Sequence, residues 1–415
     1  MNFEQHGLII VAGNSTSEDY APAANDHAFV YAVDLDGNWQ WGKFFYNVSF
    51  AVSTISGCSQ DANGNAVFLG MGNSAPIIME LNPKDGQVLK FMSLDKVGST
   101  ATSLPWYATY GAIHHDLKDD DDGLSYYYAA FIMEDALQVV KIDSVAHTIK
   151  WNFQYYKTVG LLAGDEYLNK KIPGQLHQDP NDNSRMYLFG QFTQRASVIK
   201  FSKQNMNVDW KLEIKDSAGA VAPTADMNEI YSYIQPLNDE WIYACGYKWQ
   251  DPFQETYRKA VTMKLSTEGE LQFLQQWGEA NQLDVCRAVS FDENRREVVY
   301  MLETTSPSLR PDWSRYQRYS SQNTDILIIT MQESGNFVSG FNINMDTASV
   351  SMHVGGHSFY VLDNYYVFGG MSYGYKTKFQ NSTYDILAPE YDTYVFKYDP
   401  RGSVDCFYQS TFSGS

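Results

Sequence analysis

Short apolar runs recur along this chain at intervals of about 60 residues, and each has the length of a buried strand. Most of the runs end in glycine, as at 8–13, 66–70 and 186–190. The other copies lie at 126–131, 241–246, 298–303 and 365–369. Strand-built repeats of this kind are typical of β-propellers, in which one small sheet is repeated along the chain.

The same elements follow each of these runs in the same order. A second apolar segment comes first, and in four copies it carries a lysine: Lys141, Lys200, Lys264 and Lys397. A tight turn follows, and in five copies it contains a glycine, which can adopt the positive φ of a short hairpin: Gly37, Gly86, Gly269, Gly335 and Gly402. The next strand often has a large aromatic residue: Trp41, Trp151, Trp210, Phe273 and Phe407. A fourth strand then leads into the next copy.

The pattern therefore predicts an all-β protein, a seven-bladed β-propeller of four-stranded antiparallel blades. We expect a single domain over 1–415, with blades at about 1–50, 51–106, 107–168, 169–225, 226–281, 282–346 and 347–415. A β-sandwich with accidental regularity is the alternative, whereas a parallel β-helix would need much shorter repeats. Only residues 1–6 precede the first apolar run, so we expect residues 1–5 and 410–415 to meet and complete the first blade.

The net charge and the absence of known motifs argue against several classes of function. The net charge of −19 argues against nucleic acid, because binding to phosphates depends on lysine and arginine. No apolar stretch reaches the ~18 residues of a membrane span. The chain also has no Gly-X-Ser-X-Gly elbow, phosphate-binding loop or Cys-X-X-Cys motif. We expect no cofactor, and we favour a protein that is not an enzyme.

The connections between the predicted strands differ in length. We expect those at 14–26, 95–105, 156–171, 249–259, 304–324 and 371–391 to be long and to share one face, which rigid scaffolds use for recognition. The segment 308–319 concentrates arginine and aromatic residues, the composition of protein interfaces: Arg310, Trp313, Arg315, Tyr316, Arg318 and Tyr319. The next copy adds Tyr373, Tyr375, Lys376 and Lys378. The alternative is a loop that packs on itself.

Two histidines are weak candidates for a metal site. His114 and His177 occupy matching positions in adjacent copies, two residues before Asp116 and Asp179. Imidazole and carboxylate groups bind transition metals. The favoured interpretation is that each aspartate starts the following turn through its side chain, so that no metal is expected.

The cellular compartment is weakly constrained. The four cysteines, Cys58, Cys245, Cys286 and Cys406, permit three pairings, and only Cys245 and Cys286 are expected to lie close together. Free buried thiols are the favoured interpretation. Asn14, Asn47 and Asn381 are N-glycosylation acceptors by sequence, although no signal peptide follows Met1.

Residues 61–70 contain an aspartate, a Gly-Asn turn, an apolar strand and a closing glycine. This segment resembles the repeat of secreted bacterial-type β-propellers (the SBBP-like repeat), and 26–34 with 36–41 resembles its second half. The resemblance implies an extracellular or surface protein. We predict a non-enzymatic interaction module, a subunit of a larger assembly, that binds a protein partner, another copy or a glycan. A glycan lyase or hydrolase and a cytoplasmic or ciliary scaffold are the alternatives.

Overall fold

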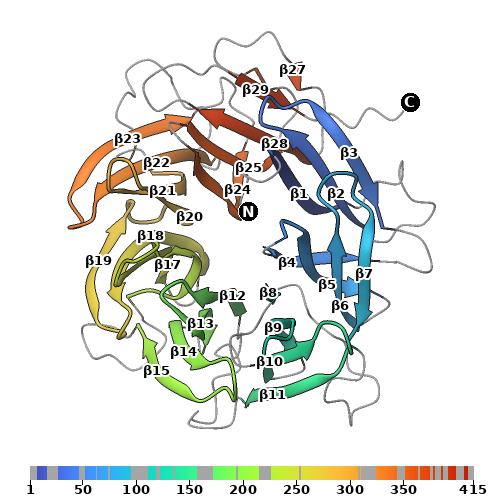
Figure 1. Ribbon diagram of the computed structural model, residues 1–415. Helices are drawn as coiled ribbons and strands as arrows, with labels where there is room; N and C mark the ends of the chain where they lie inside the picture. The colour runs from blue at the N-terminus through green and yellow to red at the C-terminus, as the bar shows by residue number, and fades with distance from the viewer. Residues whose placement is uncertain are drawn as a thin grey trace. The chain divides into compact units, whose positions relative to one another are not determined.

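The computed structural model describes residues 7–15, 27–45, 52–61, 63–72, 75–94, 111–117, 122–133, 136–156, 172–192, 195–214, 226–251, 254–306, 309, 324–343, 351–362, 365–373, 377–378, 385–386, 391–398 and 406–409. The chain divides into two compact units, Met1–Gln194 with Val198–Lys211 and Arg195–Ser197 with Leu212–Ser413. Each unit is built from antiparallel sheets, and no α-helix occurs in the ranges given (Figure 1).

The first unit contains four sheets. Their strands are β1 (Leu8–Ser15), β2 (His27–Asp34) and β3 (Trp39–Phe44); β4 (Thr54–Gln60), β5 (Ala66–Gly72), β6 (Ala75–Leu81) and β7 (Val88–Ser93); β8 (Gly111–Asp116), β9 (Tyr126–Met133), β10 (Ala136–Asp143) and β11 (Ile149–Tyr156); and β12 (Ile172–Asp179), β13 (Asp182–Phe192), β14 (Arg195–Ser202) and β15 (Val208–Glu213). The strands of each sheet pair in chain order.

The second unit contains three larger sheets and one small hairpin. Their strands are β16 (Glu229–Ile234), β17 (Trp241–Asp251), β18 (Gln254–Ser266) and β19 (Leu271–Trp277); β20 (Asp284–Asp292), β21 (Glu297–Thr304), β22 (Asp325–Gln332) and β23 (Phe337–Ile343); and β24 (Ser351–Leu362), β25 (Tyr365–Tyr373), β28 (Tyr391–Tyr398) and β29 (Cys406–Gln409). The hairpin of β26 (Thr377–Lys378) and β27 (Asp385–Ile386) interrupts the last sheet.

The prediction of an all-β protein made of four-stranded antiparallel sheets is confirmed for six of these sheets. The first sheet has three strands in the part of the chain that the structure describes. Residues 1–5 and 410–415, which we expected to complete it, lie outside the described residues. One predicted long connection is wrong. Residues 249–251 and 254–258 pair as extensions of β17 and β18, because the alternating side chains continue the ladder almost to the turn.

Adjacent sheets bury their apolar residues against each other. Within the first unit, Val67 and Leu69 of β5 share a core with Tyr127 and Ala129 of β9. The aromatic residue of a sheet's last strand, β3 or β11, also contacts the tight turn of the next sheet. Trp41 Nε1 donates to Pro83 O at 2.7 Å, and Trp151 Nε1 donates to Lys203 O at 3.0 Å. This contact explains why an aromatic residue recurs at that place in the sequence.

The first strand of several sheets carries a β-bulge, and the bulge explains the glycine that ends many apolar runs. Register shifts leave one extra residue in the first strand, namely Ser56, Gly174, Tyr231 and Arg287. The bulged strand approaches the opposite strand so closely that a Cβ on Gly70 would lie 2.3 Å from Thr54 O. Leu302 occupies the matching place beside the Arg287 bulge, so glycine is not used in every copy.

Candidate functional site

Two of the bulge residues in the second unit form the core of a candidate binding site. A bulge bends its strand and redirects a side chain. The Arg287 guanidinium lies 4.5 Å from the centre of the Tyr231 ring, and the Arg258 guanidinium lies 4.4 Å from that of Tyr247. The two tyrosine rings are 5.5 Å apart. Arginine on an aromatic face is held by cation–π attraction, which presents the cation in a fixed orientation.

Two buried glutamates balance the charge of these arginines. Arg287 Nε donates to Glu303 Oε2 at 3.0 Å, and Tyr247 donates its hydroxyl proton to Glu229 Oε2 at 2.8 Å. Glu303 is 1% exposed and Glu229 is 4% exposed. Burial works to lower the pKa of Arg287, but Glu303 outweighs it and holds this pKa above its usual range. Burial raises the pKa of Tyr231 to about 12. The tyrosines therefore remain neutral while the Arg287–Glu303 pair remains charged.

These side chains gather at one end of their sheets. Tyr231 lies near the start of β16, and Arg287 lies near the start of β20. Glu303 lies near the end of β21, and the chain leaves this end for the connection that carries 308–319. Tyr231, Arg258 and Arg287 are each partly exposed, so stacked guanidinium and phenol groups face solvent beside buried carboxylates. Such an array can bind planar, carboxylate-bearing or hydroxyl-rich groups.

The first unit brings His114 and His177 together but uses the neighbouring aspartates elsewhere. The two imidazole rings lie 6.2 Å apart, and His114 Nε2 lies 3.3 Å from Gln178 Oε1. Asp116 forms an ion pair with Lys203. Asp179 pairs with Lys200 at 3.1 Å, and its Oδ1 accepts the backbone N–H of Asn181 at 2.9 Å. Asp179 thus starts its turn as the favoured interpretation expects, and both carboxylates have ammonium partners.

The lowered pKa of His114 predicts a loss of stability in acid. Burial, with help from the charges of His177 and Lys203, lowers its pKa to about 3. Because the unfolded chain binds this proton near pH 6.5 and the folded chain does not, stability falls as pH drops from 6.5 toward 3. For this one group, the free energy of unfolding changes by at most about 1.4 kcal/mol per pH unit. We expect His114→Gln to flatten the fall of the urea midpoint between pH 7 and 4, and an unchanged slope would contradict this.

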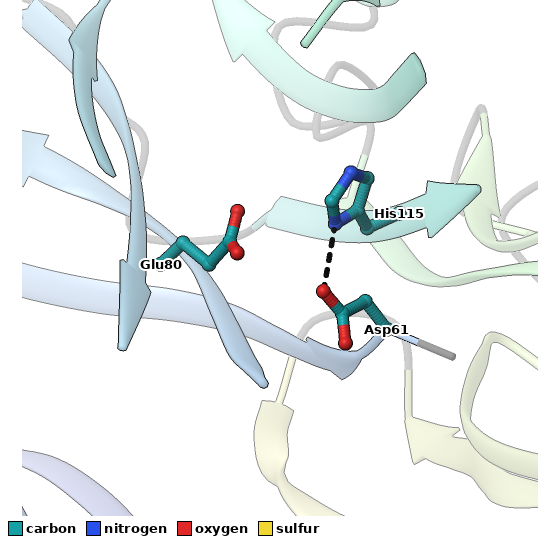
Figure 2. Close-up of side chains that lie close together, drawn as sticks. All are labelled: Asp61, Glu80 and His115. Atoms are coloured by element: carbon teal, nitrogen blue, oxygen red, sulfur yellow. Dashed lines mark ion pairs between the residues drawn. The ribbon is translucent and has the colours of Figure 1, made fainter. Parts of the chain in front are cut away.

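A second cluster in the first unit joins two sheets and was not expected from the sequence. Figure 2 shows the side chains of Asp61, Glu80 and His115 pointing toward one another. One ligand atom from each lies within 4.8 Å of the others, and all three residues are buried. Asp61 follows β4, Glu80 lies in β6 and His115 lies in β8, so the cluster joins the β4–β7 sheet to the β8–β11 sheet.

Hydrogen bonds hold each member of this cluster in place. Asp61 Oδ1 accepts the backbone N–H groups of Asn63 and Asn65 at 2.9 and 2.8 Å, which closes the turn between β4 and β5. Asn65 Nδ2 donates to Asp61 Oδ2 at 3.0 Å and to Glu80 Oε1 at 3.2 Å. Tyr127 donates its hydroxyl proton to Glu80 Oε2 at 2.7 Å. His115 Nε2 lies 3.0 Å from Ser125 Oγ.

The charges of this cluster are unusual for a buried site. Burial acts to raise the pKa of Asp61, but His115 and the bonds from Asn65 outweigh it and hold this pKa below its ordinary value. Burial and the contact with Glu80 raise the pKa of Tyr127, so its hydroxyl stays protonated as a donor. His115 Nδ1 lies 3.5 Å from Asp61 Oδ2 without the geometry of a hydrogen bond. The contact is therefore electrostatic.

Most of the other site residues predicted from the sequence lie outside the described residues, and three lie in strands. Arg310, Trp313, Arg315, Tyr316, Arg318, Tyr319, Tyr375 and Lys376 lie outside the described residues, as do Asn47 and Asn381. Tyr373 ends β25 and Lys378 ends β26. Asn14 is exposed, and its Oδ1 accepts the backbone N–H of Ile55 at 2.9 Å.

Cys58, Cys245 and Cys286 are free thiols, and Cys406 is the first residue of β29. Cys245 and Cys286 are buried in one apolar cluster, where burial and the neighbouring Cys245 raise the pKa of Cys286. No helix in the described part of the chain is both long enough and apolar enough to cross a membrane.

Sequence reasoning missed both clusters for the same reason. Tyr231 and Arg287 are single residues whose direction depends on a bulge, and Asp61, Glu80 and His115 come from three different strands. One signal was present in the sequence. Glu80 stands two residues before the turn residue Asn82, where other copies have Lys141, Lys200 and Lys264 before Asp143, Ser202 and Ser266. A reversal of charge at a repeated position would have marked the site.

No protein-family model matches this sequence, and no curated protein matches it. Among solved structures, a protein from Lactobacillus plantarum is similar with a TM-score of 0.50 and 9% identity, covering 92% of this chain and 98% of that chain. The propeller of Dos1 has a TM-score of 0.47 and 7% identity, covering 83% and 72%. The β-propeller domain of the Trilobed protease from Pyrococcus furiosus has a TM-score of 0.44 and 7% identity, covering 99% and 95%. At these identities, the similarity concerns the fold alone.

Proposed function

We propose that this chain is a seven-bladed propeller that works as a protein-binding module. Each sheet other than the β26–β27 hairpin corresponds to one blade, with the first blade completed by residues near the chain ends. The repeat order, the four-stranded antiparallel sheets and the similarity to solved propellers support this proposal. The resemblance to the secreted bacterial-type repeat is consistent with it.

The observation that carries the proposed binding role is the group around Arg287 and Tyr231. Bulges present these two side chains at the end of the sheets from which the long 304–324 connection leaves. The sequence of that connection adds three arginines and three aromatic residues. Tyrosine, tryptophan and arginine are the residues that dominate binding energy at protein interfaces. A surface rich in them on a chain of net charge −19 suits an acidic protein partner, including another copy of this chain.

The proposed contact residues are Arg310, Trp313, Arg315, Tyr316, Arg318 and Tyr319, with Tyr373, Tyr375, Lys376 and Lys378 beside them in the sequence of the next copy. Attraction between opposite charges speeds encounter and sets orientation, whereas the aromatic side chains supply most of the affinity. The two contributions predict different responses to salt. The association rate constant should fall at high ionic strength, because salt screens the attraction between charges. Aromatic substitutions should lower the affinity at any ionic strength.

Replacing both Trp313 and Tyr316 by alanine should weaken binding by about 2 kcal/mol or more at each residue that is a hot spot. Sedimentation velocity of the purified chain measures association between copies, and affinity capture with mass spectrometry measures other protein partners. Leu237→Ala is the matched control, because Leu237 is 66% exposed in the tight turn at the opposite end of β16 and β17. A parent chain that neither associates nor captures a protein contradicts the proposal. So does a double variant that binds like the parent.

A further inference from the structure

The structure assigns a divalent transition-metal site to Asp61, Glu80 and His115, with Zn²⁺ or Mn²⁺ as the cation. This inference is independent of the proposed protein binding and concerns a different place in the fold. The cation would join the β4–β7 sheet, which provides both carboxylates, to the β8–β11 sheet, which provides the imidazole. Two carboxylates and one imidazole form a nitrogen and oxygen ligand set that suits these metals.

A comparison of equivalent positions shows why this pair of carboxylates is unusual. Glu80, Lys141 and Lys264 each pair with a fourth-strand residue just before the same register shift. Lys200 stands at this position in β14, and its ammonium lies 3.1 Å from Asp179, which starts a turn just as Asp61 does. The β12–β15 sheet therefore has a buried opposite-charge pair where the β4–β7 sheet has two carboxylates. A buried pair of like charges is costly unless a cation or a proton offsets it.

The nearby positive groups offset this charge only in part. Lys90 Nζ lies 3.8 Å from Glu80 Oε2, and its side chain is 35% exposed, so water screens the interaction. Asn65 and Tyr127 donate neutral hydrogen bonds to the carboxylates. His115 is the other nearby group that can carry a positive charge, and its imidazole is neutral unless it is protonated. A bound divalent cation would balance both carboxylates without requiring a protonated imidazole.

One ring nitrogen of His115 has no hydrogen-bond partner and supports the same conclusion. His115 is 3% exposed, and its Nδ1 makes no hydrogen bond although it lies 3.5 Å from Asp61 Oδ2. The other nitrogen, Nε2, lies 3.0 Å from Ser125 Oγ, which in turn lies 2.6 Å from Ser144 Oγ. Metal-binding histidines commonly donate the N–H of their second ring nitrogen to a hydrogen-bond acceptor, which leaves the first nitrogen as the ligand. Nδ1 of His115 faces the two carboxylates in this orientation.

The geometry requires only a modest contraction. Ligand atoms around a tetrahedral zinc lie roughly 3.4 Å apart, given metal–ligand bonds of about 2.0 to 2.2 Å. The three ligand atoms here lie within 4.8 Å of one another, so rotations of the carboxylates would bring them into range. Asn65 is placed to be a fourth ligand, because turning its amide would direct the oxygen toward the carboxylates that its nitrogen now contacts.

The test offers Zn²⁺ or Mn²⁺ to the full chain during refolding, because the three side chains are buried. After gel filtration, metal content is measured by mass spectrometry, and the affinity is measured by competition with a chelator. We expect one cation per chain, and a rise in the melting temperature when metal is added. Glu80→Lys and His115→Ala should bind roughly 100-fold more weakly or worse. Glu80→Lys introduces the residue that the equivalent position has in β14, so it should preserve the fold.

Two further variants make the result decisive. His114→Ala removes the neighbouring histidine of the same strand and should bind metal like the parent. Asp61→Asn keeps an oxygen that can close the turn but removes the charge. This variant tests metal binding if Glu80→Lys does not fold. A parent chain with less than a tenth of an equivalent of metal would overturn the inference. Undiminished uptake by Glu80→Lys or Asp61→Asn, or uptake lost only in His114→Ala, would overturn it equally.

Discussion

Arg287→Met is expected to destabilise the chain by about 3 kcal/mol, because the buried Glu303 carboxylate would lose the guanidinium that faces it. The side chain of Glu303 is 1% exposed, and Arg287 Nε lies 3.0 Å from its Oε2. Methionine keeps apolar contact with the Tyr231 ring but supplies no charge. Urea unfolding, followed by tryptophan fluorescence and circular dichroism, measures the loss.

The pH dependence of this loss follows from the charge of Glu303. Without Arg287, the folded-state pKa of Glu303 should rise above its value in the unfolded chain. The destabilisation is therefore fully present at pH 8, where Glu303 is charged in both states, and it shrinks as pH falls through the raised pKa. A loss that is larger at pH 5 than at pH 8 would contradict this account.

A double variant separates charge from packing. Replacing Glu303 by leucine together with Arg287→Met removes both charges, and well-packed apolar residues often replace a buried ion pair at little cost. The double variant should therefore recover most of the stability that the single variant loses. If it is as unstable as the sum of the two single variants, the pair contributes by shape and not by charge.

Gly246→Ala is expected to destabilise the chain by about 3 kcal/mol, because it forces two backbone segments apart. A Cβ at Gly246 would lie 1.7 Å from Glu229 O, 2.8 Å from Glu229 C and 3.0 Å from Ile230 Cα. All three atoms belong to the backbone, so no side-chain rotation can relieve the overlap. The change would also displace the bulge at Tyr231, which lies opposite Gly246 in the ladder.

Gly340→Ala in the same unit is the matched control. Its Cβ would meet only Phe337 and Leu327 side chains, at 3.4 Å or more, which is ordinary contact. Alanine also lowers the conformational entropy of the unfolded chain, so this change should be neutral or slightly stabilising. Equal effects of the two substitutions in urea unfolding would show that a general loss of glycine, and not the bulge, determines the result.

The repeat in the sequence predicted the strands well because their properties depend on local patterns. The apolar run at 66–70 lies in a buried second strand, and residues 242–246 are buried in another second strand. Gly37, Gly86, Gly269 and Gly335 all have positive φ in tight turns, as the hairpin chemistry requires. Both signals involve residues close together in the chain. The predicted connection at 249–259 failed because mixed polar and aromatic residues there can still pair as a hairpin arm.

The sequence by itself determined the class of fold, the order of the strands and the positions of the tight turns, since these follow from hydrophobic period and glycine conformation. Only the tertiary structure decided which side chains meet. Arg287 reaches Tyr231 because two bulges in different sheets redirect them, and His115 meets Asp61 and Glu80 because two sheets pack together. The physical reason is that such contacts depend on distances between strands far apart in the chain, which no local pattern specifies.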